Sequence, residues 1–332
     1  VYKRQVVRKP FEAHDISINP VVHPYFVEIE PPGLGDADGD VQRLVDALKG
    51  KWQLGELTCS LPAVRRIQKA LRDGDWQVTA AIRDDREIVA VWPGLKERLY
   101  GVAVDVGSTT VAVHLCDLRN GEVIASGGRM NPQIRYGEDL MSRVSYIDSN
   151  PGAEAMLSGI VRQTISELVA EVAADADIER DDIVEATFVG NPIMQHLLLG
   201  ISPVELGRAP FTLANAASVD VTASEMGIEI NPGAHAYVLP CIAGHVGADA
   251  AGVMLAESPF DRDDISVTID VGTNAEILLG NRNRLLATSS PTGPAFEGAQ
   301  ISSGQRAAPG AIERVRIDRN TLEPRFRVIG SD

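Results

Sequence analysis

The stretch Asp105-Val106-Gly107-Ser108-Thr109-Thr110 decides the fold, because it occurs a second time as Asp270-Val271-Gly272-Thr273-Asn274. Each copy ends an apolar run of period two, and a second run of the same kind follows it. Alternating apolar residues indicate strands, and glycine with hydroxyl residues between two strands indicates a tight turn. The sequence therefore predicts one strand–turn–strand unit that is built twice.

The chemistry of both turns suits a nucleoside triphosphate. Glycine lets a phosphate approach the backbone, and the turn amides and hydroxyls can donate hydrogen bonds to it. A carboxylate at the strand end can hold Mg²⁺ directly or through water. Two facing turns would hold the phosphates from both sides. An ordinary hairpin with a turn aspartate is the alternative, and the repetition of sequence and context makes it the weaker one.

The predicted site residues follow from these turns and from two other polar segments. Asp105 and Asp270 are the predicted catalytic and Mg²⁺-associated carboxylates. Asn191 and Gln133 are predicted to orient water or phosphate, and Glu297 is predicted to touch a ligand or partner from a glycine-rich loop. The other predicted nucleotide contacts are Gly107, Ser108, Thr109, Thr110, Gly272, Thr273 and Asn274.

Composition excludes several classes of function. The chain has 46 acidic against 31 basic residues and a net charge of −15, which argues against nucleic-acid binding. No apolar run approaches the ~20 residues that cross a bilayer, and no signal peptide is visible. Cys59, Cys116 and Cys241 are widely separated, so the chain offers no iron–sulfur or zinc motif of its own. A reducing cytoplasm is the simplest compartment.

The chain is long enough for two or three domains. Residues 1–98 are predicted to form a small α/β module. It would have short strands at Val6-Val7 and near 16–18, prolines that break regularity after them, and strands at 77–82 and 87–92. Residues 99–260 are predicted as a first ribonuclease-H-like subdomain that opens with a three-strand meander. Residues 261–332 are predicted as the start of a second such subdomain, in a polypeptide that continues.

The segment from Pro240 to Gly252 is rich in small residues. Its Gly244, Ala248, Ala251 and Gly252 would lie on about one stripe of a helix. Glycine inside a helix costs roughly 0.5–1 kcal/mol relative to alanine, so a close helix crossing is expected to offset that cost. The sequence thus predicts a helix crossing at the hinge between two domains.

With these motifs the chain resembles the reductive activators of corrinoid proteins, within the actin, sugar kinase and Hsp70 superfamily. The twin phosphate turns are typical of the whole superfamily, whereas two further stretches, R-Y-G-E-D at 135–139 and G-P-A-F-E-G at 293–298, point to this family. The resemblance covers nearly the whole chain. It rests on 105–110, 131–133, 137–139, 189–192, 239–252, 270–276, 293–298 and 311–313.

The resemblance implies an α/β fold of duplicated ribonuclease-H-like domains with mixed sheets, and ATP and Mg²⁺ as cofactors. It implies an oxidoreductase that couples ATP binding and hydrolysis to the Co(II)-to-Co(I) reduction of a corrinoid protein, in a methyltransferase or O-demethylase system. The implied partners are that corrinoid protein and a low-potential electron donor, and a homodimer is expected by analogy.

Two departures from the family pattern matter. Its members usually carry an N-terminal [2Fe–2S] ferredoxin domain, and this chain has no matching cysteine cluster, so [2Fe–2S] is expected only in a domain outside it. The family's adenosine-binding segment lies beyond Asp332. Two other functions stay open from the sequence: a small-molecule kinase in which an aspartate acts as base, and a non-catalytic nucleotide-gated clamp.

Overall fold

The computed structural model describes residues 17–272, 274–292 and 310–330. The chain divides into two compact units, Val1–Gly252 and Val253–Asp332. Three sequence predictions lie outside the described residues, namely Thr273, the glycine-rich loop with Glu297, and the strand at Val6-Val7.

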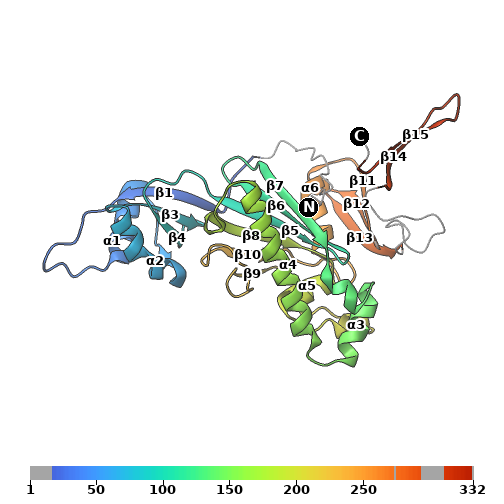
Figure 1. Cartoon of the computed structure of the whole chain (residues 1–332), viewed down its shortest axis with the longest axis horizontal. Helices are drawn as coiled ribbons and strands as arrows, with labels where there is room; N and C mark the ends of the chain where they lie inside the picture. The colour runs from blue at the N-terminus through green and yellow to red at the C-terminus, as the bar shows by residue number, and fades with distance from the viewer. Residues whose placement is uncertain (1–16, 273, 293–309, 331–332) are drawn as a thin grey trace. The chain divides into compact units, whose positions relative to one another are not determined.

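The first unit begins with the predicted α/β module. Its four-stranded sheet has the order β1-β3-β4-β2, and two helices pack their apolar stripes against it (Figure 1). The side-chain hydroxyl of Ser60 accepts a hydrogen bond from the Ala63 amide and so caps the second helix, as its sequence position predicts. The elements are β1 (Val22–Glu28), α1 (Asp40–Trp52), β2 (Thr58–Cys59), α2 (Leu61–Asp73), β3 (Gln77–Arg83) and β4 (Glu87–Pro93).

The start of this module differs from the prediction. Residues 17–20 form no strand, and β1 instead runs through Pro24, where prolines were expected to break regular structure. Pro24 pairs with Ala81 of β3, and β1 is the edge strand of its sheet. A proline is tolerated there because the edge of a sheet requires no backbone donor on its outer side.

A six-stranded mixed sheet forms the centre of the first unit, in the order β7-β6-β5-β8-β10-β9. β5 is antiparallel to β6 and parallel to β8, and β8 is parallel to β10. The predicted meander is confirmed as β5, β6 and β7. The strands are β5 (Tyr100–Val106), β6 (Thr110–Asp117), β7 (Val123–Met130), β8 (Ile183–Val189), β9 (Val219–Thr222) and β10 (His235–Val238).

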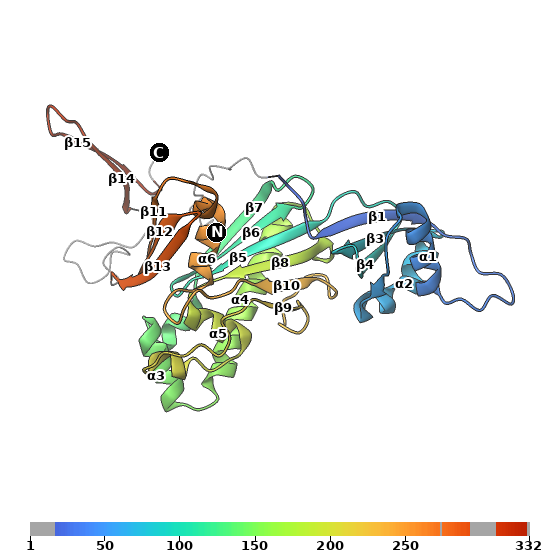
Figure 2. The same ribbon diagram turned by 180° about the vertical axis from the view of Figure 1, so that it is seen from behind.

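Helix α4 (Ala153–Asp175) covers one face of this sheet. Seen from behind, β5, β8 and β10 lie in front of it (Figure 2). Its fully buried residues, among them Leu157, Val161, Ile165 and Leu168, recur at helical spacing, so the predicted amphipathic helix is confirmed. The shorter helices of this region are η1 (Pro132–Tyr136), α3 (Leu140–Ser149), η2 (Arg180–Asp182), α5 (Pro192–Leu199) and η3 (Val204–Gly207).

The predicted helix from 240 to 252 is wrong in its first half, since α6 is Ala248–Glu257. Before it, Ala243 and Val246 pair with each other in a tight loop. A Cβ at Gly244 would lie 2.4 Å from the Phe211 carbonyl oxygen. The small residue is needed because a distant loop approaches the backbone, and not because two helices cross.

The second unit repeats the meander. β11, β12 and β13 form a three-stranded antiparallel sheet in chain order, as β5, β6 and β7 do in the first unit. The duplicated fold class predicted from the sequence is therefore correct. The elements are η4 (Pro259–Asp261), β11 (Ser266–Val271), β12 (Asn274–Asn281), β13 (Arg284–Pro291) and the hairpin of β14 (Ile312–Ile317) and β15 (Pro324–Val328).

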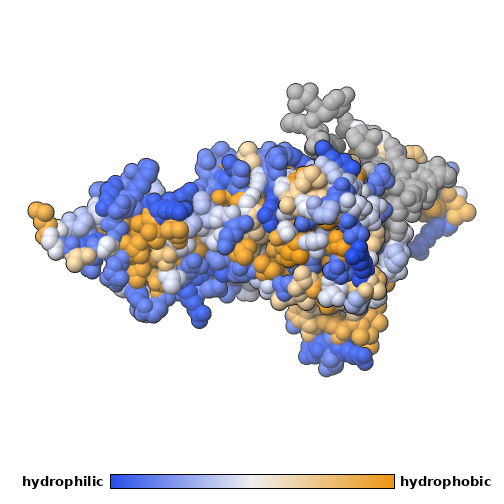
Figure 3. All heavy atoms as spheres, turned by 90° about the horizontal axis from the view of Figure 1, so that it is seen from below, coloured by the Kyte–Doolittle hydropathy of each residue, from blue (hydrophilic) through white to orange (hydrophobic). Residues whose placement is uncertain are grey.

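In the part of the chain that the structure describes, no helix is both long and apolar enough to cross a bilayer. Hydrophilic and apolar patches are interspersed on the face seen in Figure 3. Large exposed apolar side chains occur on loops as well as helices, including Leu34, Met141 and Phe211.

Candidate functional site

The first predicted turn lies where two parallel strands end. Asp105 of β5 is paired in register with Val189 of β8, so both strands end at the same edge of the sheet. The carbonyl oxygen of Gly190 accepts hydrogen bonds from the amides of Ala248 and Asp249, at 3.0 and 3.2 Å. The carboxyl ends of parallel strands are the usual place for a ligand in α/β sheets. This edge thus brings Asp105, Asn191 and Asp249 into one neighbourhood.

Glycines make this edge compact. A Cβ at Gly107 would lie 2.5 Å from the Thr110 carbonyl oxygen, and a Cβ at Gly190 would lie 2.8 Å from the Val106 carbonyl oxygen. A Cβ at Gly247 would lie 2.7 Å from the Gly190 oxygen. Any larger residue would push these backbone segments apart, so the glycines are required for the close approach of the strand ends.

Three successive carbonyl groups of the first turn point into the protein. The side-chain amide of Asn131 donates to the Gly107 oxygen at 2.9 Å, and its backbone amide donates to the Thr109 oxygen at 2.8 Å. The guanidinium of Arg143 donates to the Ser108 oxygen. In a trans peptide the N–H points opposite to the C=O. The amides of Ser108 and Thr109 therefore face away from Asn131 and Arg143, as in an anion-binding turn.

Gln133 lies behind this turn. Its side chain is buried, donates to the Leu157 carbonyl oxygen at 2.9 Å, and approaches the side-chain amide of Asn131 at 3.4 Å. The side-chain oxygen of Asn131 in turn accepts a hydrogen bond from the backbone amide of Gln133 at 3.0 Å. These contacts place Gln133 in the support of the turn, and its predicted contact with water or phosphate stays a prediction.

Asn191 begins helix α5 next to the turn. Its side-chain oxygen accepts a hydrogen bond from the Met194 amide at 3.0 Å, and Pro192 follows it at the first helical position. This is an N-cap, which satisfies one of the free amides of the first helical turn. The side chain is half-buried, at the same strand edge as Asp105.

The predicted ligand groups of the first turn reach the surface. Asp105 and Thr110 are exposed, and Ser108 and Thr109 are partly exposed. Carboxylate and hydroxyl oxygens are the hard ligands and donors that Mg²⁺ and phosphate require. This turn can therefore present hydroxyl and carboxylate oxygens to a ligand.

The second turn is one residue shorter. Val271 pairs with Ala275, whereas Val106 pairs with Val111. The Gly272 amide donates to the Asn274 carbonyl oxygen at 2.8 Å. The Thr292 hydroxyl donates to the Gly272 oxygen at 2.7 Å, which again holds a turn carbonyl in place.

Sequence reasoning missed Glu276, which follows the second turn. Asp270 is exposed, and Glu276 lies directly opposite it in the β11–β12 pair. The Glu276 carboxylate is buried and accepts a hydrogen bond from the Ser289 hydroxyl at 3.1 Å. The period of two along β12 was the available signal, because it puts Glu276 on the same face as Asn274.

Asn131 and Arg143 were also missed as site residues. Asn131 was visible only as part of a polar segment, and Arg143 only by its place on the same face of α3 as Ile147, four residues later. Both side chains are fully buried in the structure. A charged residue whose helix position faces the interior is the signal that could have been sought.

The cysteines do not form a metal site. Burial raises the pKa of the Cys59 and Cys241 thiols to about 11, and it raises the pKa of Cys116 as well. The three thiols belong to different elements, and all are free. Among the residues with described positions, no group of three or more histidine, cysteine or acidic side chains is arranged to hold a metal ion.

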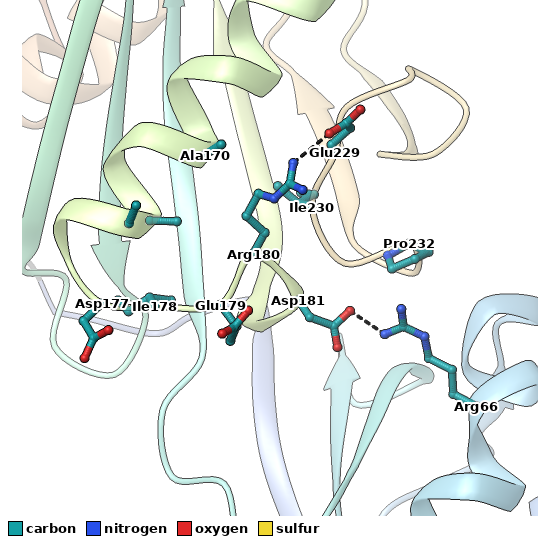
Figure 4. Close-up of a pocket in the computed structure, with 12 residues that line it drawn as sticks. Arg66, Ala170, Asp177, Ile178, Glu179, Arg180, Asp181, Glu229, Ile230 and Pro232 are labelled. Atoms are coloured by element: carbon teal, nitrogen blue, oxygen red, sulfur yellow. Dashed lines mark hydrogen bonds and ion pairs between the residues drawn. The ribbon is translucent and has the colours of Figure 1, made fainter.

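A surface hollow of about 800 Å³ lies at the other end of β8 (Figure 4). Four of its charged side chains are paired with one another. Arg180 contacts Glu229 at 2.7 Å, and Arg66 pairs with Asp181. The hollow lies beside the start of β8, whereas Asn191 follows its end, so it is separate from the phosphate turn.

Comparison with known proteins identifies the family. Residues 12–98 match a model described as the RACo linker region, residues 100–260 match the RACo middle region, and residues 264–332 match the C-terminal domain of RACo, the ASKHA domain. The chain belongs to the RACo family. The sequence-based recognition of this family is thereby confirmed.

Similar proteins carry related names. The corrinoid activation enzyme RamQ of Eubacterium limosum is 33% identical over 232 residues, which cover 70% of this chain and 38% of that protein. The [Co(II) methylated amine-specific corrinoid protein] reductase of Methanosarcina barkeri is 28% identical over 225 residues, which cover 64% of this chain and 40% of that protein.

A solved structure agrees over nearly the whole chain. The reductive activator for corrinoid, iron–sulfur protein superposes with a TM-score of 0.82 at 32% identity, covering 96% of this chain and 51% of that one. The RACo chain described here therefore spans about half or less of the length of these relatives.

Proposed function

We propose that this RACo chain is the nucleotide-binding part of an ATP-dependent reductive activator of a corrinoid protein. The match to a solved reductive activator over 96% of the chain is the observation that carries the proposal. Both curated relatives have names that refer to corrinoid activation or to the reduction of a Co(II) corrinoid protein. The orientation of the first turn supports phosphate as the ligand.

The residues present fit ATP and Mg²⁺. The amides of Ser108 and Thr109 face away from Asn131 and Arg143, an orientation suited to donation to a phosphate. Asp105 and Asp270 are exposed carboxylates suited to hold Mg²⁺. The further proposed contacts are Thr110, Gly272, Thr273, Asn274 and Glu297, with Asn191 and Gln133 as orienting groups.

The proposed reaction adds one electron to Co(II) of the partner's corrinoid and gives Co(I). ATP, when bound, would favour the conformation that binds the corrinoid protein in its reducible state, because a ligand shifts an equilibrium by its differential affinity. The electron comes from a low-potential donor. The thiols of this chain do not fit a [2Fe–2S] cluster, so we assign such a cluster to a separate domain or protein.

ATP turnover by the complete protein, measured with and without a Co(II) corrinoid protein, tests the proposal. We expect the partner to stimulate turnover, and the absorbance of Co(I) to appear only when ATP and a low-potential donor are both present. Phosphorylation of a small metabolite would contradict the proposal and support a kinase. Nucleotide binding without turnover would support a non-catalytic clamp. Sedimentation of the same sample tests the proposed homodimer.

A further inference from the structure

Arg143 is a buried cation directly behind the first turn. Its guanidinium is fully buried and donates to two backbone carbonyl oxygens, that of Gly137 at 3.0 Å and that of Ser108. Its third nitrogen approaches the Gln133 side-chain oxygen at 3.5 Å and the Met194 sulfur at 3.3 Å. All of these partners are neutral.

Within the described ranges, no carboxylate forms an ion pair with the Arg143 guanidinium. Asp139, the acidic group that acts on it, caps α3 through Ser142. Burial lowers the pKa of Arg143 to about 10, so it remains protonated near neutral pH. Burying a charge is costly unless an opposite charge compensates it.

The location of Arg143 indicates what compensates it. The Ser108 carbonyl that accepts its hydrogen bond belongs to the same peptide as the Thr109 amide, which faces the opposite side. A hydrogen bond to the carbonyl polarises the peptide and makes its N–H a stronger donor. The side of this peptide opposite Arg143 is where the proposed phosphate would lie.

We propose that Arg143 holds the phosphate-binding turn in position and gives it a positive charge. The phosphate of the bound nucleotide would be the counter-ion of Arg143, on the opposite side of the Ser108–Thr109 peptide. This inference rests on the proposed function, because it requires the nucleotide phosphate at the first turn. Arg143 acts through the peptide and does not touch the ligand. It also ties the turn to Gly137, in the segment that leads into α3.

Affinity measurements on the complete protein test this role. Dissociation constants for Mg·ATP, Mg·ADP and AMP are measured for the wild type, Arg143→Met and Arg143→Lys, together with thermal unfolding without nucleotide. Arg162→Met is the matched control. Arg162 is a half-buried arginine that also donates to a backbone oxygen, that of Leu198 at 2.8 Å, and burial lowers its pKa too.

We expect Arg143→Met to weaken Mg·ATP binding at least about tenfold, the usual scale for loss of a charge-assisted hydrogen bond. The loss should shrink from ATP to ADP to AMP, because the ligand charge falls. Arg143→Lys should recover part of it, since lysine keeps the charge but cannot bridge both carbonyls. Arg162→Met should bind all three nucleotides as the wild type does.

Mg·ATP affinity within twofold of the wild type in folded Arg143→Met would overturn the inference. An equal loss for all three nucleotides would also overturn it, because it would indicate a purely structural role. If Arg143→Met does not fold, Arg143→Lys decides alone: a loss of about threefold or more for Mg·ATP supports the role, and unchanged affinity overturns it. Wild-type protein that binds no Mg·ATP would instead contradict the proposed function.

Discussion

Glu276 lies directly opposite Asp270 in the β11–β12 pair, where the first copy of the meander has Ala112 opposite Asp105. Opposite residues of an antiparallel pair share one face, with Cβ atoms about 4.5–5.5 Å apart. The second turn therefore has two carboxylates on one face, and the first has one. Glu276 is buried against Ser289 and Asp270 is exposed, so Asp270 is the group available to a metal ion.

Asp270→Ala is expected to lower Mg·ATP turnover of the complete protein at least about 100-fold, the scale that loss of a metal-associated carboxylate can reach. Stability should stay within about 0.5 kcal/mol, because the side chain is exposed and its removal relieves like-charge repulsion with Glu276. Steady-state turnover and urea unfolding measure the two effects.

Asp264→Ala is the control for this prediction. Asp264 is an exposed aspartate that precedes β11 in the same unit. Its removal should leave both turnover and stability unchanged. If Asp270→Ala turned over Mg·ATP as Asp264→Ala does, Asp270 would have no place in the site.

Gly107→Ala is expected to weaken Mg·ATP binding at least about tenfold and to cost roughly 1–3 kcal/mol of stability, the range for overpacking. The added Cβ would lie 2.5 Å from the Thr110 carbonyl oxygen, so the turn must move. Gly159→Ala in α4 is the control. Nothing lies within 4 Å of a Cβ at Gly159, and this exposed helix position should gain about 0.5–1 kcal/mol. Equal nucleotide affinity in the two variants would contradict the tight turn.

The strands and the long helix could be predicted because their signal is local. Period two marks β5 and β6, and the spacing of Ile165, Leu168 and Val172 marks α4, whatever packs against them. The two turns could be predicted equally well, because Gly107 and Gly272 each lie between two such alternating runs. The duplicated fold and the candidate site residues of the two turns were predicted from these local patterns.

What the sequence could not supply depends on contacts between distant residues. Arg143 resembles any helix-surface arginine until the Ser108 carbonyl is found beside its guanidinium. Gly244 fits a helical stripe, but it is small because the backbone at Phe211 passes it. Pro24 indicated a break, and only the position of β1 at a sheet edge accommodates it. In each case the deciding partner lies far away in the sequence.

The buried Glu185 carboxyl group is expected to make the free energy of unfolding depend on pH. Burial raises its pKa to about 7, although Arg83 and His235 act to lower it and Asp220 adds to the increase. Arg83 approaches Glu185 at 3.5 Å and Asp220 at 2.8 Å. Because the folded-state pKa is raised, folding favours the protonated form. This contribution is complete below the unfolded pKa of about 4.3 and is lost as the pH rises through about 7.

Glu185→Gln should therefore unfold like the wild type near pH 4 and be more stable above pH 7, by at most about 3 kcal/mol. Urea unfolding between pH 4 and 8 measures the difference. Glu229→Gln is the control, because Glu229 is a largely exposed carboxylate paired with Arg180. Parallel stability curves for the wild type and Glu185→Gln would show that Glu185 titrates alike in both states.

Variants of Asn191 distinguish its role as a helix cap from a role at the nucleotide. Its side-chain oxygen accepts a hydrogen bond from the Met194 amide at 3.0 Å, and loss of such a cap costs about 1 kcal/mol. Asn191→Ala should lose that stability, and Asn191→Ser should keep most of it because serine also caps helices. If Asn191 orients water or phosphate, both variants should lose Mg·ATP turnover, by about tenfold, because neither retains the amide.

Ser60→Ala provides the comparison for Asn191, because Ser60 caps α2 through Ala63 in the N-terminal module. It should lose about 1 kcal/mol of stability and keep full turnover. Urea unfolding and steady-state turnover of the three variants distinguish the two roles of Asn191. Full turnover in Asn191→Ser would confine Asn191 to capping α5. The orienting role would then have to come from another group at this strand edge, such as Asp249, which lies beside Gly190.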